Sequence, residues 1–106
     1  MAAEHELIHT LNNDLELQLP QVISEDNLLH KLSEFVADLI ENNFQRLILL
    51  LYKLDISEKK LRQLLMETDE DAAVLIARLI IERETQKVIT RNSFRKENDI
   101  PEEEKW

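Results

Sequence analysis

Apolar residues recur at three- and four-residue intervals along most of the chain, the spacing that places side chains on one face of an α-helix. The first such stretch runs from about residue 3 to residue 17. We expect it to end before Pro20, because proline disfavours α geometry in the residue that precedes it. Its apolar side is formed by Leu7, Ile8, Leu11 and Leu15. The pattern therefore predicts an amphipathic helix near the N-terminus, followed by a connector over residues 18–24.

A longer stretch with the same spacing follows this connector. Ser24 or Asp26 can cap it, because a side-chain oxygen can accept hydrogen bonds from the free N–H groups of a first turn. The apolar positions of this stretch are Leu28, Leu32, Phe35, Val36, Leu39, Ile40, Phe44, Leu47, Ile48 and Leu51. The simplest interpretation is one helix from about residue 26 to residue 54. Asn42 and Asn43 are its weakest point, since asparagine is a poor helix former.

Two further helices complete the predicted fold. Ser57 can cap a short helix over residues 58–66. Thr68 or Asp69 can cap a long helix over residues 69–92, whose first turn is rich in acidic residues, as the helix dipole favours. The chain is therefore predicted to be all-α, a small antiparallel helical bundle of two long helices, one short helix and the N-terminal helix.

The composition fits a single helical domain. The chain has 106 residues, no glycine and no cysteine. Without glycine, tight hairpin turns and glycine-rich phosphate-binding loops are not expected, and without cysteine there is no disulfide or cysteine nucleophile. We assign residues 1–95 to one helical domain. Residues 96–106 are predicted to form an acidic C-terminal tail, because they combine few apolar residues with a run of charge.

The formal net charge of −9 comes from the two ends of the chain. Residues 1–26 hold six carboxylates and no Lys or Arg, whereas residues 27–95 hold equal numbers of acids and bases. Such a chain repels phosphate backbones overall, so nucleic-acid binding is not expected. The longest apolar runs, 47–52 and 72–77, are far shorter than the roughly 18 residues of a membrane span. The N-terminus also lacks the basic region of a signal peptide, and we expect a cytoplasmic location without membrane binding.

Two segments carry more apolar surface than a single helix face can bury. Residues 47–52 are apolar all round the helix, and in residues 72–81 only Arg78 is polar. We expect this surplus apolar surface to drive self-association into a homodimer or a higher homo-oligomer. Binding of an unidentified protein partner is the other way in which the surface could be covered. The predicted interface consists of Leu47, Ile48, Leu51, Tyr52, Leu75, Ile76, Leu79 and Ile80. The alternative is that the N-terminal helix folds back and seals a monomer.

The sequence His5-Glu6-Leu7-Ile8-His9 has the H-E-x-x-H pattern of zinc metallopeptidases. In that chemistry two histidines one turn apart bind zinc, and the glutamate activates a zinc-bound water. A third ligand could come from residues 33–38, which partly match a downstream pattern of such enzymes. However, only four residues precede His5, which leaves no room for the sheet that forms the substrate cleft. A zinc-dependent hydrolase is therefore the alternative interpretation. A further possibility is that His5 and His9 bind a metal ion incidentally, without catalysis. We expect no resident cofactor.

A row of cations follows one edge of the last predicted helix, at four-residue spacing. It consists of Arg83, Lys87, Arg91 and Arg95. A phosphate backbone could use this row, which makes nucleic-acid binding a second alternative. No aromatic residues interleave with it to stack on bases, and the helix dipole already favours cations at this end. A simpler hypothesis is that the acidic N-terminal segment packs near this edge, in the same chain or a neighbouring one.

No serine stands in a recognisable nucleophile arrangement, so no catalytic residue is assigned. The sequence therefore predicts a small non-catalytic helical module for interaction or regulation, which associates with itself through apolar helix faces.

Overall fold

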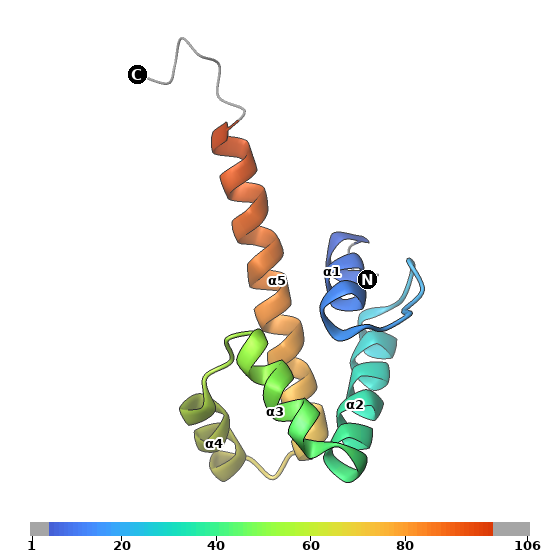
Figure 1. Ribbon diagram of the computed structural model, residues 1–106, viewed down its shortest axis with the longest axis vertical. Helices are drawn as coiled ribbons and strands as arrows, with labels where there is room; N and C mark the ends of the chain where they lie inside the picture. Colours follow the sequence, from blue (N-terminus) through green and yellow to red (C-terminus); the bar gives the residue numbers. More distant parts are fainter. Residues whose placement is uncertain (1–4, 99–106) are drawn as a thin grey trace.

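The computed structural model of the protein describes residues 5–98, with side chains as far as residue 93. Every regular element in this range is a helix, which confirms the all-α prediction. The five helices are α1 (His5–Leu15), α2 (Glu25–Asn42), α3 (Phe44–Lys53), α4 (Glu58–Glu67) and α5 (Ala72–Asn98) (Figure 1). No helix in the described range has the length and apolar character needed to cross a bilayer.

Helix α5 is the longest helix and packs against α2, α1 and α4, whereas α3 packs against α2 (Figure 1). Helix α2 makes the most extensive contact with α5, and α1 packs against α5 further along its length. After α2 the chain turns back, so that α3 runs in the opposite direction across the bundle. Helix α4 contacts α5 only sparsely and has no fully buried residue.

The prediction of one continuous helix over residues 26–54 is wrong, because the helix stops at Asn43. The backbone of Asn43 leaves helical geometry, with φ of −158° and ψ of 65°. Its side-chain Oδ1 accepts a hydrogen bond from the Arg46 N–H at 3.2 Å, and its own N–H donates to the Leu39 carbonyl at 2.9 Å. Asn43 therefore ends α2 and caps α3, because an asparagine side chain can replace the backbone as a hydrogen-bond acceptor.

The remaining helix ends lie close to the predicted ones, except that the last helix, predicted over residues 69–92, both begins and ends later. Ser24 and Ser57 cap α2 and α4 as expected, each accepting a hydrogen bond from the N–H three residues later. Helix α5 begins later than predicted, because Asp71 caps it by accepting from the Ala73 N–H at 2.8 Å. Its backbone stays helical to Asn98, so the first residues of the predicted acidic tail are helical, and residues 99–106 lie outside the described range.

Four helices contribute to one continuous apolar core. Helix α1 buries three side chains in this core. The N-terminal helix therefore folds back onto its own chain, as in the alternative to self-association given by the sequence. The core residues are Ile8, Leu11, Leu15, Ile23, Leu28, Leu32, Val36, Leu39, Leu47, Leu50, Leu51, Leu54, Ala73, Ile76, Ala77 and Ile80. Burial of these side chains supplies the main stabilisation of the fold.

Candidate functional site

The predicted interface divides into buried and exposed residues. Six of its members are buried within the single chain: Leu47, Leu51, Leu75, Ile76, Leu79 and Ile80. Ile48 is half-buried, and Tyr52 is 79 % exposed. Only these last two can reach another molecule without a rearrangement of the core. Self-association stays a prediction, and any interface in the folded chain has to be built around Ile48 and Tyr52.

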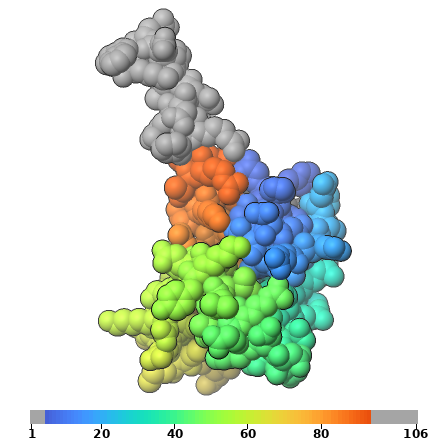
Figure 2. All heavy atoms as spheres, in the orientation of Figure 1, coloured from blue at the N-terminus to red at the C-terminus, as the bar shows by residue number. Residues whose placement is uncertain are grey.

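Helix α3 presents further apolar side chains beside these two. Phe44 and Leu49 are both exposed, the latter by 61 %. Residues 44, 48 and 52 follow one another at four-residue spacing and therefore share one side of the helix. We call Phe44, Ile48, Leu49 and Tyr52 the α3 face. Helix α3 lies on the near side of the molecule in Figure 2, where its atoms are green.

A hollow of about 240 Å³ adjoins the α3 face where the chain passes from α3 into α4. It is lined by Ile48, Leu51, Tyr52, Asp55, Ile56, Glu58 and Leu61. Most of this lining is apolar, and the two carboxylates are exposed. An exposed apolar row next to an apolar hollow is the arrangement found where proteins dock on one another.

The predicted basic edge is partly occupied by contacts within the chain. Arg83 Nε donates to the Leu54 carbonyl at 2.9 Å, and Lys87 Nζ lies 2.7 Å from Asp14 Oδ2. Arg91 is exposed, and the side chain of Arg95 lies outside the described residues. The hypothesis that the acidic N-terminal segment packs near this edge is confirmed at Asp14, within the same chain. Two of the four cations, Arg83 and Lys87, therefore bond to other parts of the same chain.

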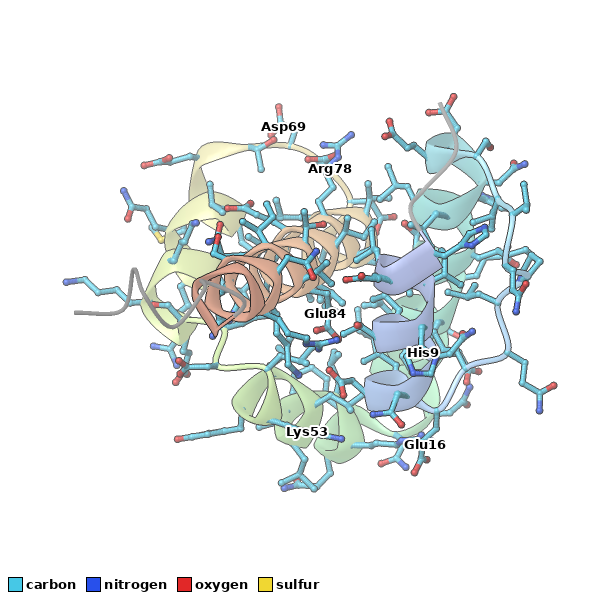
Figure 3. All side chains as sticks on the ribbon, turned by 90° about the horizontal axis from the view of Figure 1, so that it is seen from above. His9, Glu16, Lys53, Asp69, Arg78 and Glu84 are labelled. Carbon is cyan, nitrogen blue, oxygen red and sulfur yellow. The ribbon has the colours of Figure 1, made fainter. Side chains whose placement is uncertain are left out.

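His5 and His9 both lie exposed on α1 (Figure 3 labels His9). Among the side chains of residues 5–93, no three or more of His, Asp or Glu come close enough together to hold a metal ion. Glu34, in the segment considered for a third ligand, lies on α2, where its Oε1 is 2.9 Å from His30 Nε2. The structure therefore brings no third ligand to the histidine pair, and incidental metal binding by the two histidines stays a prediction.

A cluster of charged side chains lies between α1 and α5. Glu84 on α5 is 0 % exposed, and Asp14 on α1 is 7 % exposed. Figure 3 shows Glu84 directed from α5 toward α1, with Lys53 of α3 on a neighbouring side. Lys87 contacts the Asp14 carboxylate, and Lys53 Nζ donates to the Asp14 backbone carbonyl at 3.3 Å. We call Asp14 and Glu84 the buried carboxyl pair.

The two carboxyl groups of the pair have opposite pKa shifts. Burial raises the pKa of Glu84 to about 7, and the neighbouring Asp14 carboxylate acts in the same direction. Burial also opposes ionisation of Asp14. The hydrogen bond from Lys87, the nearby Glu84 carboxyl group, and the charges of Lys87 and Lys53 nevertheless hold the Asp14 pKa below its usual value. At neutral pH Asp14 is therefore ionised, while Glu84 is partly protonated.

The chain matches no family model, no curated protein and no solved structure. Its function therefore has to be inferred from its own geometry. Within the described residues, the geometry offers an apolar surface on α3 and a buried carboxyl pair that can hold a proton.

Apolar spacing and charge runs do not reveal the buried carboxyl pair. In the sequence, Asp14 is one of six carboxylates in residues 1–26, and Glu84 stands directly after Arg83 of the basic row. One signal was present, because Glu84 lies four residues after Ile80 and four before Val88, and both of these are buried. A carboxylate within the apolar stripe of a helix is a candidate buried acid.

Proposed function

We propose that the protein is a small non-catalytic interaction module that forms a homodimer through the α3 face. The observation that carries the proposal is the exposed apolar row on α3 beside the hollow at the start of α4. Burying an exposed aromatic side chain and its apolar neighbours removes unfavourable contact with water. A cytoplasmic location stays a prediction from the sequence.

A second copy is the partner that suits this surface. The α3 face combines an exposed aromatic side chain, Tyr52, with an adjacent apolar hollow, so one copy offers both a side chain to bury and a place to receive one. A two-fold axis near Tyr52 places this side chain of each copy against the partner's hollow, as a symmetric interface requires.

Light scattering over a dilution series tests the proposal. The wild-type chain is expected to have the mass of a dimer and to dissociate on dilution. Tyr52→Asp and Leu49→Asp are each expected to give a monomer, because a carboxylate in the centre of an apolar interface loses its hydration. Both side chains are exposed, so the folded monomer is expected to retain its helical circular dichroism.

Val22→Asp is the matched control. Val22 is also an exposed apolar residue, 71 % accessible, but it lies in the connector between α1 and α2. This variant is expected to keep the wild-type mass. The proposal is wrong if the wild-type chain is a monomer at high concentration, or if it is a dimer that neither α3 substitution dissociates.

A further inference from the structure

Glu84 is buried in the contact between α1 and α5. Both of its carboxylate oxygens are fully buried, and within the described residues neither accepts a hydrogen bond from an N–H or O–H group. On α1, Glu6 Oε2 and the Thr10 hydroxyl, two turns and one turn before Asp14, are also buried without a partner. An ionised carboxylate in such a place loses its hydration without gaining a hydrogen bond, and only the charges of Lys87 and Lys53 offset part of that cost.

Asp14 is the neighbour to which Glu84 can bond. An ionised carboxylate only accepts hydrogen bonds, so two carboxyl groups can bond to each other only when one of them carries a proton. Asp14 is held as an anion by Lys87, whose Nζ lies 2.7 Å from Oδ2. The proton therefore belongs on Glu84, which is the more deeply buried of the two.

We propose that Glu84 carries a proton that it donates to Asp14, and that this hydrogen bond locks helix α1 onto helix α5 until the proton is lost. Loss of the proton places two negative charges side by side in the contact between the helices. Lys87 from α5 and Lys53 from α3 are the cations that act on Glu84, and both already bond to Asp14. Movement of α1 away from α5 relieves the repulsion and lets water reach Glu84.

The expected pH dependence has a defined sign. The pKa of Glu84 rises from 4.5 to about 7 when α1 is docked. The docked state therefore binds a proton that the undocked state releases, and docking weakens as the pH rises toward 7. The lowered pKa of Asp14 has the opposite effect, but only below its usual value of 3.8. Between pH 5.5 and 7 the opening constant of α1 is expected to rise about tenfold per pH unit, and then to level off.

Hydrogen exchange of the α1 amides in the full-length chain, corrected for the intrinsic pH dependence of exchange, measures this opening. The wild-type chain is expected to lose protection over residues 5–15 as the pH rises from 5.5 to 7. Glu84→Gln keeps a neutral amide donor toward Asp14, so α1 is expected to stay equally protected across this range. Glu82→Gln removes an exposed carboxylate from the same helix and is expected to retain the wild-type decline. A pH-independent wild type, or a decline in Glu84→Gln equal to that of the wild type, overturns the proposal.

Infrared spectroscopy tests the proton itself, without any need for α1 to open. The wild-type chain at pH 6 is expected to show the carbonyl band of a protonated carboxylic acid. The band is expected to be missing in Glu84→Gln and in the wild type well above pH 7. If the wild type lacks this band at pH 6, Glu84 is ionised and the proposal is wrong. The result is separable from that of the dimer proposal, which is read from the solution mass.

Discussion

Single polar side chains decide where the helices of this protein begin and end. Asn43 ends α2 with its backbone N–H and caps α3 with its side-chain and backbone oxygens. Asn12 fastens the connector that follows α1. Its Oδ1 accepts from the Leu19 N–H at 2.8 Å, and its Nδ2 donates to the Leu19 carbonyl at 3.2 Å. In a chain without glycine, such bonds stabilise the turns between helices.

Asn43→Ala is expected to lower the free energy of unfolding by about 1 kcal/mol, because the cap on α3 is lost. Urea denaturation followed by circular dichroism measures the change. Asn42→Ala is the control: the Asn42 side chain bonds only to the exposed Asp38, and alanine is the better helix former. If Asn43→Ala is as stable as Asn42→Ala, the cap does not stabilise the break between α2 and α3.

Lys87→Met is expected to cost about 1 to 3 kcal/mol at pH 7, because it leaves the buried Asp14 charge without its closest partner. The cost is expected to shrink as the pH falls through the lowered pKa of Asp14, since protonation removes that charge. Urea denaturation at pH 7 and at pH 2.5 to 3 measures both effects. Lys60→Met, which breaks an exposed contact with Glu82 at 3.6 Å, is expected to change stability by less than about 0.5 kcal/mol. Equal costs for the two variants contradict this account.

At the scale of whole helices, the elements differ in how many apolar side chains they bury in the core. Helix α2 lies along α5 and buries a row of four apolar residues, whereas α4 buries none completely. Helix α1 is short but buries Ile8, Leu11 and Leu15, so its apolar face docks it onto the bundle. The stability of each helix therefore depends on its packing more than on its length.

Helix α4 is expected to exchange its amide hydrogens faster than any other described helix, because local opening there exposes little apolar surface. Hydrogen exchange measured by mass spectrometry at pH 6 checks this, with α2 as the reference of highest protection. Leu61 and Leu64 are only half-buried, so substitution of either by Ala is expected to leave α2 protection unchanged. Protection in α4 equal to that in α2 contradicts the expectation.

At the scale of the whole molecule, the core is a single cluster to which α1, α2, α3 and α5 all contribute. Loss of one contributor therefore weakens the entire fold. Leu11→Ala, at a site of 0 % exposure on α1, is expected to lower the free energy of unfolding by about 2 to 5 kcal/mol. Helical circular dichroism and hydrogen exchange of α2 are expected to report the same transition.

Leu49→Ala is the matched control for Leu11→Ala, because the same change occurs on the exposed α3 face. Its effect on the unfolding of the monomer is expected to stay below about 1 kcal/mol. If Leu11→Ala leaves the unfolding transition of α2 unchanged, the contacts of α1 do not stabilise the rest of the core.

The sequence by itself determined the features that depend on neighbours along the chain. The helical class follows from apolar spacing, and the caps at Ser24 and Ser57 act on N–H groups three residues away. Two members of the α3 face, the half-buried Ile48 and the exposed Tyr52, are among the predicted interface residues for the same reason. They lie in an apolar run that no single helix face can bury.

Only the tertiary structure decided which helix faces pack against one another. Periodicity alone could not show that the chain turns back at Asn43, because an asparagine within a helix and an asparagine that ends one have the same neighbours. It also could not show that α1 covers the core, or that Asp14 lies beside Glu84 and Lys87, about 70 residues further along the chain. Burial and charge pairing between distant residues depend on the packing of whole helices, and so the buried carboxyl pair becomes visible only in the folded chain.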